Sequence, residues 1–242
     1  MKYIHIVAIF LGIMATAYGD GTNSPATDPV IARVLDRNIL LSEQTDLNGI
    51  IFGALMERYS EGCAKPTQAD IAPFVESTER HKTARIKDWE TERDELSRQL
   101  ESDALSESER STITSNFNKV DKRLKMDAVF AEKAASDPEE SRKTEERIAE
   151  SFVRAWKVNL ALYEQYGGRV IFQQAGVEPL DAYRLFLQEQ EAAGNFQILD
   201  KQYEASFWNY FTNDTMHSFY PTDEGDKFMR TPWWLSSEKP EE

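Results

Sequence analysis

The sequence DPEESRKTEERIAESFVRAWKVNLALYEQYGG, residues 137–168, contains the start, the apolar face and the end of one long helix. Asp137 is a suitable N-cap, Pro138 fits the first helical position, and the acids that follow face the positive end of the helix dipole. The pair Gly167-Gly168 is typical of a helix stop. Between these signals, apolar residues recur every three or four positions and predict a broad stripe: Ile148, Phe152, Ala155, Trp156, Leu160 and Tyr163. We expect this helix to be central to the core.

On the C-terminal side the chain predicts two further helices. Residues 169–174 fit a short strand or an extended link, and Pro179 then opens a helix that runs to Ala193 and is closed by Gly194. Asp200 is the expected cap of a last helix that ends near Phe211. Residues 221–242 are expected to form an irregular acidic tail.

On the N-terminal side, residues 76–133 are rich in charge and carry only narrow apolar stripes. The stripe residues are Ile86, Trp89, Leu96 and Leu100, followed by Ile113, Phe117, Val120 and Leu124. Between the two stripes, Ser106-Glu107-Ser108-Glu109 has the form of a capping box. The pattern therefore predicts the two antiparallel arms of a helical hairpin that turns near residues 103–106, with the intervening charges on solvated faces.

Residues 30–75 complete the apolar part of the chain. Residues 30–35 fit one strand or an extended arm, and a helical stripe runs from Ser42 to Gly62. Thr67 is the expected N-cap of the next helix, in which Pro73 predicts a short first piece followed by a new start or a kink.

Together these patterns predict an all-α fold with one or two very short strands and a long protruding helical hairpin. Residues 30–75 and 140–220 would form a discontinuous helical core, and residues 76–139 a charged hairpin inserted between its halves. Residues 20–29 are expected to be a flexible leader.

The first nineteen residues predict export. Met1-Lys2 is a small positive region, residues 4–17 are almost wholly apolar, and Ala17-Tyr18-Gly19 fits a signal-peptidase site before Asp20. An apolar run of about 14 residues spans about 21 Å as a helix, whereas the bilayer core is about 30 Å thick. We therefore expect a periplasmic or secreted protein with no integral membrane segment after signal cleavage.

Charge and cysteine content exclude several classes. The formal net charge of -14 disfavours nucleic acid and anionic membrane surfaces as partners, because phosphate binding needs a basic face. The single cysteine, Cys63, cannot form an intramolecular disulfide and fits a small residue at a helix-to-loop junction.

Catalytic signatures are weak, so neither a cofactor nor a metal is expected. His81 lies in a charged run that fits a solvated helix face, and no spaced array of histidine, cysteine and acids is present. Asp214 and His217 lie three residues apart and could contribute to a metal site, but a capping aspartate and a half-buried histidine is the favoured interpretation.

Four stretches resemble the N-terminal helical domain of SurA- and PrsA-type periplasmic foldases. They are residues 31–42, similar to its opening strand, residues 55–59 within its first long helix, residues 65–71, similar to the turn that follows, and residues 174–187, similar to a later helix. The resemblance covers about a third of the chain and implies a helical polypeptide-binding domain. The prolyl isomerase activity of those foldases resides in a separate parvulin domain, for which this chain has no room.

The sequence thus favours a non-enzymatic, chaperone-like or assembly module that binds unfolded or partner polypeptide. The expected binding surface is the exposed part of an aromatic set: Phe207, Trp208, Tyr210, Phe211, Phe219 and Tyr220. Two alternatives stay open. One is a scaffold that docks a partner through the charged hairpin, and the other is a hydrolase-like enzyme with a cleft near the double glycine, built from Arg169, Glu178, Asp181 and His217.

Overall fold

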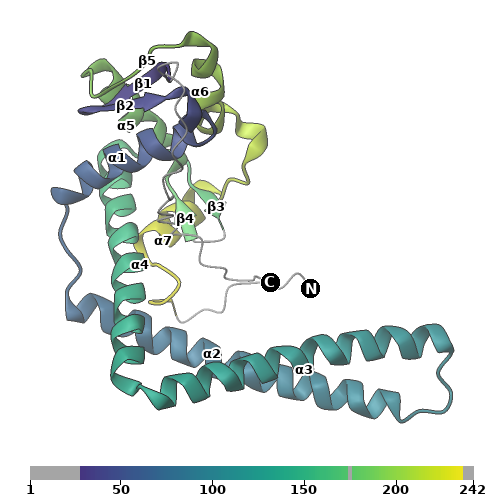
Figure 1. Cartoon of the computed structure of the whole chain (residues 1–242). Helices are drawn as coiled ribbons and strands as arrows, with labels where there is room; N and C mark the ends of the chain where they lie inside the picture. The colour runs from purple at the N-terminus through teal and green to yellow at the C-terminus, as the bar shows by residue number, and fades with distance from the viewer. Residues whose placement is uncertain (1–27, 174–175, 237–242) are drawn as a thin grey trace, which may run out of the picture. The chain divides into compact units, whose positions relative to one another are not determined.

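The computed structural model describes residues 28–173 and 176–236, and the predicted signal segment lies outside them. The fold is mainly helical with a few short strands, which confirms the predicted class. Contacts between Cα atoms divide the chain into two units. We call Pro66–Arg154 the hairpin unit, and the described residues up to Lys65 and from Ala155 onward the core unit (Figure 1).

A three-stranded antiparallel sheet in the core unit joins segments that are far apart in the sequence. Strands β1 (Val30–Val34), β2 (Arg37–Leu40) and β5 (Phe196–Ile198) lie in the order β2-β1-β5. Ala32 pairs with Ile198, and Leu35 makes the β1–β2 turn with a positive φ of 51°. Strands β2 and β5 were not expected, because three or four residues are too few for a period of two to be recognised.

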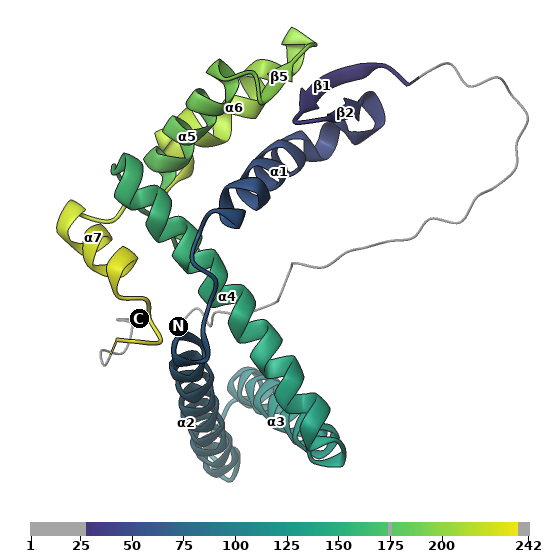
Figure 2. The ribbon, with the colours of Figure 1, turned by 90° about the vertical axis from the view of Figure 1, so that its left-hand side faces the viewer.

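Helices pack around this sheet to complete the core. They are η1 (Leu41–Asp46), α1 (Leu47–Glu61), α5 (Leu180–Ala192), η2 (Lys201–Tyr203) and α6 (Glu204–Thr212). Figure 2 shows α5 and α6 next to each other. The largest fully buried side chains include Phe196 and Phe207, whose ring centroids are 5.4 Å apart. Asp200 caps η2, which leads directly into α6.

Helix α4 (Pro138–Tyr166) begins and ends where the sequence predicts, and its residues contribute to both units. The Glu140 amide donates to the Asp137 carboxylate at 3.1 Å, and Gly167 and Gly168 have φ angles of 65° and 96°. The buried residues differ from the predicted stripe: Ala149 and Val153 are buried on one side of the helix, Val158 and Leu162 are buried on nearly the opposite side further along it, and Ile148 is exposed. The larger side chains of the predicted stripe, such as Phe152 and Trp156, are only half-buried.

The last part of the core unit is more regular than expected. Strands β3 (Ile171–Gln173) and β4 (Gly176–Glu178) form an antiparallel pair, η3 spans Asp214–Met216, and α7 spans Thr222–Arg230. The expectation of an irregular chain from residue 221 was therefore wrong over α7. This helix has few apolar residues and reveals no stripe in the sequence, but Gly225 brings its backbone close to the Val170 side chain.

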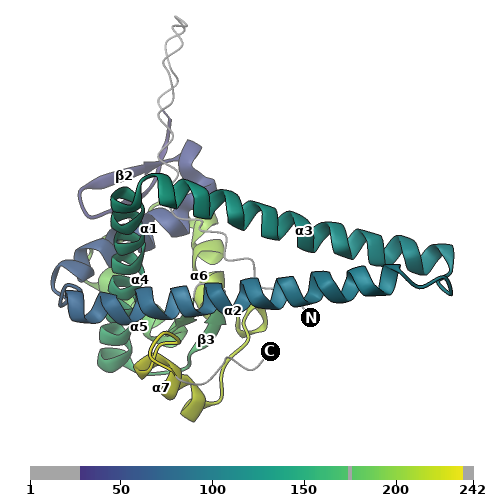
Figure 3. The same ribbon diagram turned by 90° about the horizontal axis from the view of Figure 1, so that it is seen from below.

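The hairpin unit contains the two arms that the sequence predicts. Helices α2 (Gln68–Leu100) and α3 (Glu107–Ser136) lie side by side and antiparallel (Figures 1 and 3). The Ser106–Glu109 capping box is formed, with the Ser106 amide donating to Glu109 at 2.9 Å. Helix α2 starts after Thr67 and continues through Pro73, contrary to the predicted short first piece. Because Pro73 lies in the second turn, its missing N–H removes a single intrahelical hydrogen bond.

Few side chains of α2 and α3 are buried: Ile71, Phe74, Ser77 and Val120. The Phe74 ring stacks on Phe152 of α4 with centroids 5.4 Å apart. Trp89 is half-buried and lies near two guanidinium groups, with Arg85 at 5.2 Å and Arg123 of α3 at 5.8 Å from its ring centroid. The arms thus associate through a narrow seam. Among the residues the structure describes, no helix combines the length and the apolar content needed to cross a membrane.

Candidate functional site

The aromatic set proposed from the sequence lies together in the core unit, mostly as packing surface. Phe207 and Phe211 are buried, and the other four members are half-buried. Trp208, Tyr210 and Phe219 pack against the core cluster. Tyr220 contacts the rings of Phe172 and Phe228. Only the edges of four rings are therefore accessible to a partner.

A second group of residues surrounds the guanidinium of Arg169. Its Nε and Nη2 donate to the two carboxylate oxygens of Asp181 at 2.9 and 3.1 Å. Its Nη1 and Nη2 donate to Asp214 at 2.6 and 2.9 Å. The guanidinium carbon also lies 4.2 Å from the centroid of the Phe219 ring, which is a cation–π contact. All three guanidinium nitrogens are therefore engaged within the protein.

This cluster shifts the pKa values of its members. Burial alone would raise the pKa of Asp181, but the hydrogen bonds from Arg169 outweigh it and hold that pKa below its ordinary value. Hydrogen bonds from Arg169 likewise lower the pKa of Asp214. The cluster also fixes the turn after α4: a Cβ atom on Gly168 would lie 2.4 Å from the Asp181 Cβ, so this close approach requires glycine.

A third group joins Glu178, Tyr210 and His217. The Tyr210 hydroxyl donates to Glu178 Oε2 at 3.2 Å, and Gln173 Nε2 donates to that hydroxyl at 3.3 Å. His217 Nε2 lies 2.7 Å from the Tyr210 carbonyl oxygen, so Nε2 carries a hydrogen. His217 Nδ1 is buried and has no hydrogen-bond partner among the described residues.

Burial dominates the electrostatics of this group. Burial raises the pKa of Glu178, opposed by the hydrogen bond from Tyr210 and by His217. Burial and the nearby Glu178 carboxylate raise the pKa of Tyr210 to about 12. The phenol therefore stays protonated and can donate to Glu178 at neutral pH.

The four residues of the enzyme alternative thus fall into two neighbouring polar groups of one unit. Four of the five guanidinium N–H groups of Arg169 already donate to Asp181 and Asp214, whose charges offset the cation, so the group is poorly suited to bind an anionic substrate. Glu178 and His217 border the same tyrosine, Tyr210. Over residues 28–173 and 176–236, no group of three or more histidine, cysteine and acidic side chains is arranged to hold a metal ion. The geometry fits the polar groups best as links between β4, α5 and α6.

The hairpin unit carries a different kind of site on α3, which we call the α3 apolar strip: Met126, Val129 and Phe130. These side chains are 50, 63 and 62% exposed. Together with Asp121, Lys122 and Lys125 they line an open groove of about 330 Å³. Spacings of three and four residues place them on one face of the helix.

Sequence reasoning missed this strip because it assigned only one apolar stripe to α3, the one that contains Val120 and Leu124. At about 100° per residue, Met126 lies almost opposite Leu124 around the helix axis. The signal in the sequence was a second apolar stripe on a helix that needs one stripe to pack against α2.

No protein-family model, no curated protein and no solved structure matches this chain.

Proposed function

We propose that this protein is an exported, non-enzymatic polypeptide-binding module, chaperone-like or assembly-related, that contacts its partner through the α3 apolar strip. This combines the polypeptide-binding function expected from the sequence with the alternative in which the hairpin docks a partner. The observation that carries the proposal is the exposure of Met126, Val129 and Phe130 next to one another on a single helix face.

The energetics of the strip support this role. Scattered exposed apolar side chains are ordinary on protein surfaces, whereas contiguous ones often mark interaction sites. Full burial of one such side chain contributes about 1.5 to 3 kcal/mol. Three of them on one helix face suit helix-in-groove recognition, in which anchors lie at spacings of three and four residues.

The polar groups of the core unit give less support to a catalytic function. The carboxylates of Asp181 and Asp214 are already paired with Arg169. The edges of Trp208, Tyr210, Phe219 and Tyr220 offer a secondary contact surface. The α3 apolar strip presents more accessible apolar area per residue, so we assign it the main role.

The test is suppression of aggregation of an unfolded client protein. We compare the wild type with the triple variant Met126→Gln, Val129→Gln, Phe130→Gln, because glutamine keeps a good helix propensity. The matched control is Ile148→Gln, an isolated exposed apolar side chain of the same unit. We expect the triple variant to lose most of the suppression and the control to retain it.

Circular dichroism of each variant verifies that it is folded. Equal suppression by the wild type and the triple variant, or no suppression by the wild type, would reject the proposal. Polar replacement of Tyr220 in a further variant measures how much the aromatic set contributes to the suppression of aggregation. Export is tested separately by amino-terminal sequencing of the extracytoplasmic protein, which should begin near Asp20.

A further inference from the structure

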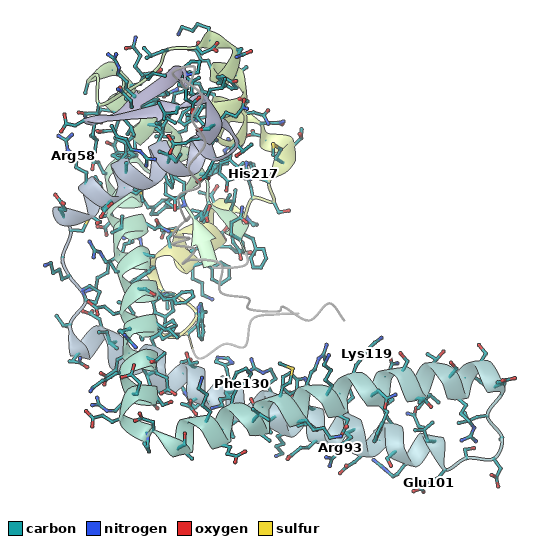
Figure 4. All side chains as sticks on the ribbon, in the orientation of Figure 1. Arg58, Arg93, Glu101, Lys119, Phe130 and His217 are labelled. Atoms are coloured by element: carbon teal, nitrogen blue, oxygen red, sulfur yellow. The ribbon has the colours of Figure 1, made fainter. Side chains whose placement is uncertain are left out.

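The face of α3 that carries the apolar strip also carries lysines at both ends. At about 100° per residue, Lys119, Lys122 and Lys133 lie within about 40° of Met126 around the helix axis. All three lysines are exposed, and none forms an ion pair among the residues that the structure describes. Figure 4 shows Lys119 and Phe130 on the same edge of α3.

The acids of this segment lie away from the centre of the strip face, although Asp121 lines the groove. Asp121, Asp127 and Glu132 are each displaced by about 100° or more from Met126 around the axis. Asp121 is also neutralised by Lys125, with Nζ and Oδ2 2.7 Å apart. The strip face is therefore cationic at both ends, although the whole chain has a net charge of -14.

From this charge pattern we infer the chemistry of the partner, an inference that rests on the proposed function. We propose that the strip binds an acidic amphipathic helix, with apolar side chains at its centre and Asp or Glu at both ends. The face from Lys119 to Lys133 is about 21 Å long, which corresponds to about four helical turns of the partner. Apolar anchors would supply most of the affinity, and the flanking charges would set specificity and orientation.

Two other occupants fit the face less well. Two copies of α3 packed face to face and antiparallel would bring Lys122 of one copy near Lys133 of the other, and like charges oppose such pairing. An anionic lipid surface attracts the lysines, but three apolar side chains offer a small area for insertion, and the net charge repels the whole molecule.

The test is binding of fluorescent synthetic peptides, measured by anisotropy at low and high salt. One peptide has a leucine stripe at helical spacing with glutamates at both ends. The second keeps the leucine stripe but has lysines at both ends, and the third has the composition of the first with the leucines scrambled. We expect the first peptide to bind at least about tenfold more tightly than either of the others, with a preference that weakens at high salt.

Reversing the charge of the strip lysines is the decisive part of the experiment. The variant Lys119→Glu, Lys122→Glu, Lys133→Glu should invert the preference between the first two peptides. The matched control reverses three exposed cations outside α3, Lys65→Glu, Arg80→Glu and Lys87→Glu, and should leave the preference unchanged.

The possible failures are distinguishable. If the glutamine triple variant reduces client binding but the two leucine-stripe peptides bind equally, the strip is a binding site and the acidic partner is wrong. If the triple variant leaves client binding unchanged, the proposed function itself fails. Binding to anionic vesicles but to none of the peptides would also contradict an acidic helix as the partner. Concentration-dependent dimerisation that the leucine-stripe peptides do not compete with would contradict it as well.

Discussion

Arg169 satisfies two carboxylates with one guanidinium and so links three segments of the core unit. It follows the Gly167-Gly168 turn, it pairs with Asp181 at the start of α5, and it pairs with Asp214 in η3. Asp181 is the most buried charged residue of this group. Replacing it with asparagine would keep one acceptor oxygen but remove the charge and the second acceptor, and so weaken the contact between the turn and α5.

We expect Asp181→Asn to lower the free energy of unfolding at pH 7 by about 1.5 to 3 kcal/mol, the range for a hydrogen bond to a charged group. The folded-state pKa of Asp181 is depressed, so its contribution is present above the unfolded pKa and is lost as the pH falls through the folded pKa. The variant should therefore show a smaller loss of stability on acidification below about pH 4 than the wild type. Urea unfolding at several pH values measures both effects.

Glu178→Gln is the matched control, because burial raises the pKa of Glu178 and gives the opposite sign. Ionisation of Glu178 opposes folding, so this variant should be relatively more stable at neutral pH than at acidic pH when compared with the wild type. If the stability of the two variants relative to the wild type changed with pH in the same direction, the opposite pKa shifts of Asp181 and Glu178 would be contradicted.

At the scale of elements, α4 shows how a large residue that is only half-buried can still matter for stability. Trp156 is half-buried, but its indole Nε1 donates to the Met229 carbonyl of α7 at 2.8 Å. Its ring also meets Trp234 edge-on, with centroids 5.7 Å apart. Trp156 therefore helps to attach α7 and the segment after it to α4, together with Tyr163, whose hydroxyl donates to Asp226 at 3.3 Å, and Glu164, which pairs with Arg230.

We expect Trp156→Ala to reduce the free energy of unfolding by about 3 to 5 kcal/mol, the usual cost of truncating a large packed aromatic side chain. Trp156→Phe should retain part of the ring contact and lose the hydrogen bond, for a smaller cost of about 1 kcal/mol. Trp233→Ala is the comparison and should cost less than Trp156→Ala. A negligible loss in Trp156→Ala, measured by denaturant unfolding, would show that α7 is held by other contacts.

Helix ends and the long helices could be predicted from the sequence because their signals are local. The Asp137-Pro138 start, the Ser106–Glu109 capping box and the glycine stop after Tyr166 each need only a few adjacent residues. The buried residues of α4 differ from the predicted stripe because side-chain size, as in Phe152, does not reveal which residues other elements cover. The short strands β2 and β5 depend on pairing with β1, a contact between residues far apart in the chain.

The candidate site was predictable only in part for the same reason. Arg169, Glu178, Asp181 and His217 were singled out together, and they do lie in neighbouring polar groups. Their pairing with Asp214 and Tyr210 depends on tertiary contacts that no spacing encodes. The α3 apolar strip was present in the sequence as a second stripe, but the sequence does not reveal that this stripe stays exposed while the other one packs.

For the whole molecule, the two units should differ in local stability. The α2 and α3 seam buries few side chains, whereas the core unit contains a large cluster of buried residues that includes Phe196 and Phe207. We expect amide hydrogens in the middle of α2 and α3 to exchange faster than those of α5 and β1. Hydrogen exchange followed by mass spectrometry measures this, and equal protection in both units would show that they unfold as one.

The pairing of β1 with β5 also determines when the core can form as the chain is synthesised. Ala32 can pair with Ile198 only after most of the protein has been synthesised. Strand β1 therefore lacks its partner β5 for most of elongation. The hairpin needs only its own residues. Once Phe74 stacks on Phe152, the loop that remains between β1 and β5 is roughly halved, which reduces the entropic cost of closing it by about 0.6 kcal/mol. The hairpin can thus fold first and lower the entropic cost of pairing β1 with β5.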